Sequence, residues 1–153
     1  MSDNYIRIIP IDPKWIPGDD KKADIEDGIT DLFPNAQEVE LVHDEGVQFR
    51  DCGSNLEKIN CPKCNAEISI DNWQELVDLD YSEVRQEFKL EPIILECCGY
   101  KCSINDLKYD FDQGFSTVEI SVMNPRVGNI TAGFQTEIES IIGCKVKIIF
   151  QHI

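Results

Sequence analysis

The stretch INCPKCNAEI, residues 59–68, begins a cysteine-rich region in the middle of the chain. Cys61 and Cys64 are separated by Pro62 and Lys63, and the proline favours a tight turn in which both thiolates can point at one ion. Five of the seven cysteines lie between residues 59 and 106. On both sides of this region the apolar residues instead recur at the spacing of strands and helices.

The N-terminal part predicts a strand, a helix and a hairpin. Residues 4–12, NYIRIIPID, alternate and are rich in isoleucine, as in a β-strand. Residues 21–34 place Ile25, Ile29, Leu32 and Phe33 on one helical face, and Pro34 ends the helix. Residues 38–51 contain two short alternating runs around residues 44–46, Asp-Glu-Gly, which predicts a hairpin turn there.

The C-terminal part repeats this order. Residues 115–125, FSTVEISVMNP, alternate as a strand. Asn129 is a plausible N-cap for a helix whose apolar stripe runs from Ile130 to Ile142, and Gly143 sits where a C-terminal glycine belongs. Residues 145–153, KVKIIFQHI, predict a closing strand.

Two strand–helix–strand units at the ends of the chain predict an antiparallel sheet with helices on one face. We therefore expect an α+β fold, a ferredoxin-like (βαβ)2 sandwich with an inserted cysteine-rich, zinc-ribbon-like module. Residues 1–51 and 113–153 would form the sandwich halves. Residues 52–112 would form the inserted module, with a short acidic helix that begins at Asp71.

The cysteines predict a metal site, because zinc needs four ligands and a second cluster follows the first. Cys98 and Cys102 are four residues apart, which fits one turn of a helix. We expect zinc to be bound by Cys61, Cys64, Cys98 and Cys102, with Cys97 as the substitute for either of the last two. Four cysteines would make a closed, structural site. Buried free thiols or a redox-active pair are the alternatives.

Residues 59–106 resemble a zinc-ribbon or treble-clef knuckle of the CPxC type, although the spacing of the second cluster departs from that family. The stretches NYIRIIP, FRDCGSN, CPKC and SINDLKYDF together resemble small bacterial proteins that carry a cysteine knuckle. That resemblance implies a zinc-binding module and brings no established activity with it.

Charge limits the classes of partner. The chain has 29 acidic and 14 basic residues, a net charge of −15. Such a surface repels phosphate backbones and anionic membranes, so we expect no binding to nucleic acid or to a membrane. It suits a basic protein partner. The sequence shows no secretory signal, and with free thiols we expect a cytoplasmic protein.

The leading functional expectation is a non-enzymatic protein-interaction module, of which an immunity protein or antitoxin that masks a basic toxin is one example. The expected contact face combines acidic and aromatic residues of the acidic stretch: Trp73, Asp78, Asp80, Tyr81, Glu83 and Phe88. The alternative is a small enzyme with a Cys52–His43 site between the sandwich and the cysteine module. Nucleic-acid binding through the knuckle is a third possibility, which net charge opposes. The sequence leaves the oligomeric state open.

Overall fold

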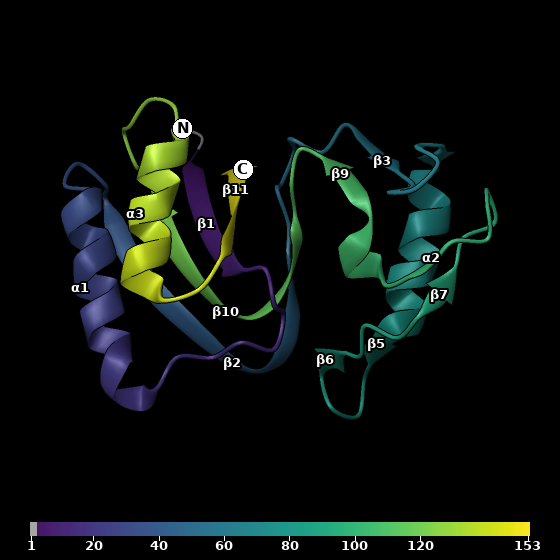
Figure 1. Cartoon of the computed structure of the whole chain (residues 1–153), viewed down its shortest axis with the longest axis horizontal. Coiled ribbons are helices and arrows are strands. Elements are labelled where there is room, and N and C mark those ends of the chain that lie inside the picture. The colour runs from purple at the N-terminus through teal and green to yellow at the C-terminus, as the bar shows by residue number, and fades with distance from the viewer. Residues whose placement is uncertain (1–2) are drawn as a thin grey trace.

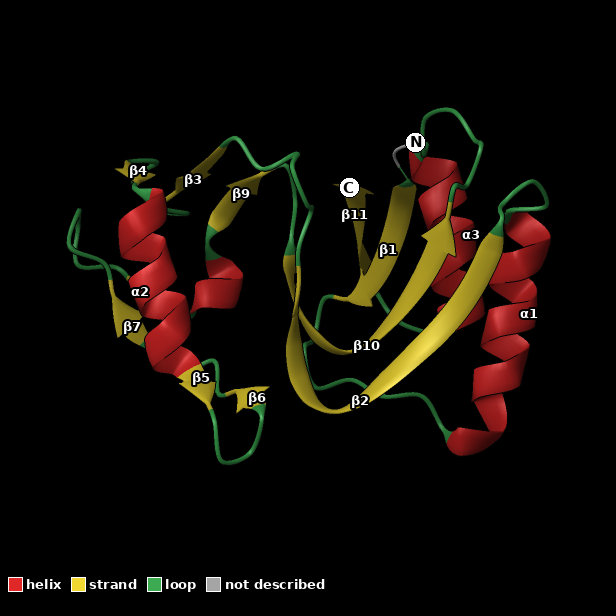
Figure 2. Cartoon of the chain, turned by 180° about the vertical axis from the view of Figure 1, so that it is seen from behind, coloured by secondary structure: helices red, strands yellow, loops and turns green. Residues whose placement is uncertain are grey.

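Strands from the two ends of the chain pair to form the largest sheet. The computed structural model describes residues 3–153 as an α+β fold with antiparallel sheets (Figure 1). The four strands of the large sheet are β1 (Asn4–Pro10), β2 (Glu38–Arg50), β10 (Gly114–Met123) and β11 (Val146–His152). Their order is β11-β1-β10-β2. The helices α1 (Lys22–Leu32) and α3 (Ala132–Ile142) cover one face of this sheet, and we call these six elements the sheet layer (Figure 2).

Alternating isoleucines build the core of the sheet layer, as the sequence predicts. Ile6 and Ile8 of β1 lie beside Val122 and Ile120 of β10, and all four side chains are buried on the helix-covered face. The two helices complete this core with side chains at helical spacing: Ile25 and Ile29 from α1, and Ile138 and Ile142 from α3. The strands expected at residues 4–12, 115–125 and 145–153 and the two expected helices are therefore confirmed.

The start of α3 differs from the prediction. Thr131, not Asn129, is the N-cap, and its side chain accepts a hydrogen bond from the backbone N–H of Phe134 at 3.1 Å. Both residue types can cap a helix, and the position nearest to the first helical turn makes the bond. The C-terminal expectation is confirmed, since Gly143 ends α3 in the left-handed conformation.

The predicted hairpin at residues 44–46 is wrong, because β2 runs through this region as a single strand of 13 residues. Its register with β10 shifts between Ser116 and Val118, where residues 44–47 bulge away from the ladder. Gly46 serves a tertiary contact instead of a turn. A Cβ atom at this position would collide with the side chain of Glu87.

Residues 58–110 form a second unit of small elements, which we call the cysteine lobe (Figure 1). Its helix is α2 (Ile70–Asp80), which confirms the expected helix near Asp71, and Ser69 is the N-cap. Its strands are β3 (Lys58–Asn60), β4 (Glu67–Ile68), β5 (Tyr81–Ser82), β6 (Glu87–Phe88), β7 (Ile93–Ile94), β8 (Lys101–Cys102) and β9 (Lys108–Asp110). They pair as β4-β3-β9, β5-β6 and β7-β8. The short 3-10 helices η1 (Asp19–Lys21) and η2 (Ile104–Asp106) complete the elements.

The two parts share apolar contacts. The core of the cysteine lobe contains Ile59, Trp73 and Tyr109, and it also takes in Val47 from β2 and Phe115 from β10. Phe115 is fully buried and lies 5.0 Å, between ring centroids, from Phe49 and from Phe88. The expected boundaries of the inserted module, residues 52 and 112, stay a prediction. Among residues 3–153 no helix is long and apolar enough to cross a membrane.

Candidate metal centre

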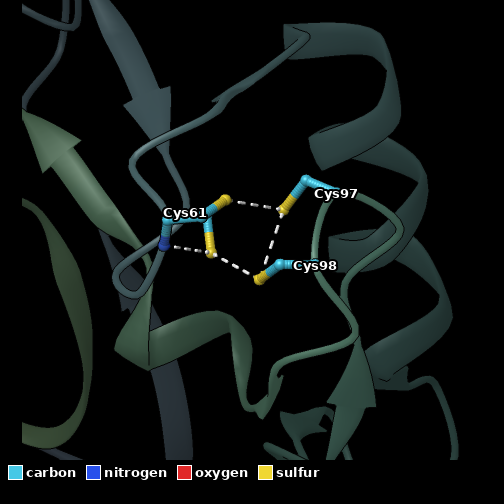
Figure 3. A group of neighbouring side chains, drawn as sticks. Cys61, Cys97 and Cys98 are labelled. Atoms are coloured by element: carbon cyan, nitrogen blue, oxygen red, sulfur yellow. Dashed lines mark hydrogen bonds between the residues drawn. The ribbon is translucent and has the colours of Figure 1, made fainter.

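Two turns of the cysteine lobe bring four cysteines together. Cys61 and Cys64 lie in the turn between β3 and β4, and Cys97 and Cys98 lie in the turn between β7 and β8. These turns are more than thirty residues apart in the sequence, yet their cysteine sulfur atoms all lie within 4.8 Å of one another. Figure 3 shows the side chains of Cys61, Cys97 and Cys98 pointing toward a common centre.

The two turns have the same backbone hydrogen bonds. In the first, the N–H of Asn65 donates to Cys61 O at 3.0 Å. In the second, the N–H of Gly99 donates to Leu95 O at 2.8 Å. Asn65 and Gly99 both have positive φ angles, of 63° and 72°, which glycine and asparagine tolerate best. The first turn, Cys61-Pro62-Lys63-Cys64-Asn65-Ala66, thus corresponds position by position to the second, Leu95-Glu96-Cys97-Cys98-Gly99-Tyr100.

This correspondence explains the irregular spacing of the second cysteine cluster. Cys98 occupies the position of Cys64, but Leu95 occupies the position of Cys61 and is buried. The fourth sulfur atom comes instead from Cys97, which corresponds to Lys63. The second turn therefore keeps the backbone of the first while it supplies its two thiols from adjacent residues.

The distances between the sulfur atoms fit one four-coordinate ion. Three of the six are 3.4 Å for Cys64–Cys97, 3.7 Å for Cys61–Cys98 and 3.9 Å for Cys97–Cys98, and all six are within 4.8 Å. A regular tetrahedron with metal–sulfur bonds of about 2.3 Å has edges of about 3.8 Å. A [4Fe–4S] cluster would hold its ligands farther apart, because each thiolate binds a different iron. The four cysteines could therefore hold a single metal ion.

Hydrogen bonds at the centre favour a thiolate on Cys61. Burial raises the pKa of Cys61, but the backbone N–H groups of Cys64 and Lys63 donate to its sulfur at 3.5 and 3.4 Å. Together with hydrogen bonds from the side chains of Cys64 and Cys97, they lower that pKa to about 6. The hydrogen bond with Cys64 raises the pKa of Cys97 to about 12. The remaining protons are those that a bound cation would displace, because metals bind thiolates and not thiols.

Cys102 does not join the other four. The sequence predicts a helical turn from Cys98 to Cys102, but this segment is the β7–β8 turn followed by strand β8. The 3-10 helix begins only at Ile104. Cys102 is buried in the core of the cysteine lobe, and burial raises the pKa of its thiol. Cys97, the expected substitute, takes its place beside Cys61.

The remaining two cysteines are separate from the centre. Cys52 is fully buried, and its sulfur lies 3.5 Å from Gln113 Oε1. Desolvation by burial raises the pKa of Cys52 and, to about 11, that of Cys144. Within residues 3–153 no hydrogen bond joins Cys52 to His43, and a buried thiol with a raised pKa is a poor nucleophile. These contacts give the alternative Cys52–His43 enzyme site no support.

The expected contact face of the acidic stretch is only partly exposed. Trp73 and Asp80 are buried, which removes them from the surface. Tyr81 and Phe88 are half-buried and contact each other edge to face, with ring centroids 4.9 Å apart. Asp78 and Glu83 remain exposed.

The buried residues of this stretch have structural contacts. Trp73 Nε1 donates to the hydroxyl of Tyr109 at 3.0 Å, which anchors α2 to the core. The Asp80 carboxylate accepts hydrogen bonds from the backbone N–H groups of Leu90 and Glu91, at 2.7 and 2.9 Å. The helical spacing of Trp73, Val77 and Asp80 could have indicated their burial, because the three residues lie on the same face of α2.

Comparison with known proteins adds no relative. No protein-family model, curated protein or solved structure matches this chain. The resemblance of residues 59–106 to a zinc-ribbon or treble-clef knuckle stays an expectation from the sequence. The case for a metal centre rests on the arrangement of the four sulfur atoms.

Proposed function

We propose that Cys61, Cys64, Cys97 and Cys98 bind one zinc ion in a closed, structural site. The observation that carries this proposal is that all four sulfur atoms lie within 4.8 Å of one another, and three of their six distances, 3.4–3.9 Å, are close to the edges of a four-thiolate tetrahedron. An all-sulfur set selects zinc, copper(I) or iron over magnesium or calcium. Zinc is favoured because it has no redox chemistry and commonly takes four cysteines in structural sites.

The proposed role of the protein is a non-enzymatic interaction module with an acidic surface for a basic protein partner. Four protein ligands leave no open coordination position for a substrate or water, which argues against catalysis at the metal. The net charge of −15 favours fast association with a basic partner. An immunity protein or antitoxin that covers a basic toxin would have these properties.

The proposal also includes a ferredoxin-like sandwich with a zinc-ribbon-like insertion, and a cytoplasmic location. The strand order β11-β1-β10-β2 and the helices on one face support a ferredoxin-like sandwich. The two matching turns support a zinc-ribbon-like insertion between residues 52 and 112. The cysteines form no disulfide, which suits the reducing cytoplasm.

Metal content tests the proposed site. Protein purified without chelators should contain about one zinc per chain by elemental analysis. Cys61→Ser should abolish this zinc, whereas Cys144→Ser should retain it, because Cys144 lies outside the cluster. Wild-type protein without metal, or equal zinc in both variants, would contradict the proposal. Iron in place of zinc would support the four proposed ligands but show that the proposed metal is wrong.

Co-purification from the native host tests the proposed role. A tagged wild-type chain should retain, in stoichiometric amount, a partner rich in lysine and arginine, and elevated salt should weaken the complex. A chain that stays alone and turns over a metabolite would favour the enzyme alternative instead.

A further inference from the structure

A groove lies beside the proposed metal centre, between α2 and the β7–β8 hairpin. Its volume is about 430 Å³. Its apolar side chains are Ile68, Leu76, Leu79, Ile94 and Leu95, and its acidic side chains are Glu67, Glu75 and Glu96. Cys97 also lines it, so the groove and the candidate metal centre share a residue. We call it the α2–β7 groove.

Two of the apolar side chains of this groove are largely exposed. Leu79 is 78% exposed and Ile94 is 71% exposed, whereas Trp73 and Val77 on the other side of α2 are buried. The hydrophobic effect gives no reason to leave two large aliphatic side chains together in water. Exposed apolar groups that gather in one depression, with polar residues around them, mark interaction sites.

The charged residues that line the α2–β7 groove are all acidic, and Lys101 lies outside this lining, opposite Ile94 in the β7–β8 pair. Glu67, Glu75 and Glu96 are exposed, and no lysine or arginine lines the groove. The sequence between Lys63 and Arg85 contains six acidic residues and no basic residue. An apolar segment without charge would gain no electrostatic attraction from these acidic residues, and an acidic segment would be repelled by them. The complementary ligand has positive charge on both sides of its apolar side chains.

We propose that the α2–β7 groove binds a segment of a partner protein in which one or two aliphatic side chains are flanked by lysine or arginine. The inference rests on the proposed interaction role and names where on the protein, and by what chemistry, the partner binds. The aliphatic side chains would cover Leu79 and Ile94, and the basic side chains would meet Glu75 and Glu96. A metal ion on Cys97 would hold the wall of the groove in place.

Defined peptides test this proposal without knowledge of the natural partner. The probe is a short fluorescent peptide of lysine and leucine, compared with a lysine–serine peptide and a glutamate–leucine peptide of equal length. Binding is measured by fluorescence anisotropy at near-physiological salt. The lysine–leucine peptide should bind at least about tenfold more tightly than either of the others, because only it matches both the apolar and the acidic side chains.

Substitutions locate the binding site. The double change Leu79→Ser and Ile94→Ser should weaken the lysine–leucine peptide about tenfold or more, while it leaves net charge unchanged. Val84→Ser is the matched control, because Val84 is 97% exposed but does not line the groove. The double change Glu75→Gln and Glu96→Gln should weaken binding severalfold and reduce its dependence on salt. Asp31→Asn with Glu40→Gln, exposed positions of the sheet layer, should do neither.

The outcomes separate the groove from the proposed function. If the Leu79/Ile94 variant binds like wild type, or the lysine–serine peptide binds as well as the lysine–leucine peptide, only net charge attracts the probe and the groove proposal is overturned. Zinc measured in the same samples decides on the metal centre independently. Zinc-containing protein with an inert groove keeps the metal proposal, and zinc-free protein rejects the metal proposal whatever the peptides show.

Discussion

The sheet layer and the cysteine lobe hold their shapes by different means. The sheet layer has four strands of 7 to 13 residues, and its two helices bury isoleucines against one face. The cysteine lobe has strands of two or three residues, and its two cysteine turns lie at its surface. Long strands with a continuous apolar face stabilise themselves, whereas two-residue strands need a further cross-link.

The difference lies within the cysteine lobe as well as between the two parts. Its inner half packs around Ile59, Trp73 and Phe115 and shares its core with the large sheet. The β3–β4 and β7–β8 turns contribute Cys61 and Leu95 to this core but expose Cys64, Cys97 and Cys98, and the four thiols connect the two turns. A metal ion at that point would join two segments that are distant in the sequence, as a disulfide does in secreted domains.

The largest expected effect comes from a residue that the two parts share. Phe115→Ala should lower the free energy of unfolding by about 3–5 kcal/mol, because a fully buried ring leaves a cavity. Since Trp15 packs in the sheet layer and Trp73 in the cysteine lobe, variants that retain one tryptophan report on each part during urea unfolding. Both reporters should shift to lower urea concentration.

Phe111→Ala provides the control for that experiment. Phe111 is 44% exposed, so its loss should cost about 1 kcal/mol or less. If Phe115→Ala shifted only one of the two tryptophan signals, the shared core would be wrong and the parts would unfold independently.

The next effect separates metal ligand from core cysteine. Cys97→Ser should weaken zinc binding at least about a hundredfold, measured by competition with a chelator, because a four-thiolate site loses one bond. Cys102→Ala should change zinc affinity by no more than about threefold, although it lowers stability, because Cys102 is a buried core residue. Equal loss of zinc in the two variants would show that Cys102 is also a zinc ligand.

The smallest effect concerns the sheet layer alone. Thr131→Ala should lower the stability of the sheet layer by about 1 kcal/mol, because it removes the N-cap hydrogen bond of α3. Asn129→Ala should change it by less than about 0.5 kcal/mol. Thermal unfolding followed through Trp15 measures both, and the zinc content should be the same in each. A larger effect of Asn129→Ala than of Thr131→Ala would show that Asn129 is the N-cap of α3, as the sequence predicted.

The elements of the sheet layer were predictable because their signals are periodic and local. Isoleucines two residues apart predicted β1, and apolar residues at helical spacing predicted α1 and α3. The continuation of β2 through Gly46, where the sequence predicted a hairpin, was not predictable. This glycine has the local signature of a turn, but its small size accommodates Glu87, forty-one residues away.

The candidate site was predictable only in part. Cys61 and Cys64 form a recognisable pair, and the presence of a second cluster indicated further ligands. The choice between Cys97 and Cys102 depended on whether the segment after Cys98 turns as a helix or as a hairpin. Gly99 held that information, because it occupies the same place after Cys98 as Asn65 does after Cys64.

Hydrogen exchange of the protein before and after metal removal tests whether a metal ion on four thiolates holds the two turns of the cysteine lobe, while the sheet layer is stable by its own core. After chelation, the amides of Cys61 and Leu95, which close the two turns, should exchange much faster. Amides of β1, β10 and β11 should keep their protection. Equal loss of protection throughout the chain, or no change at the two turns, would contradict this role of the metal ion.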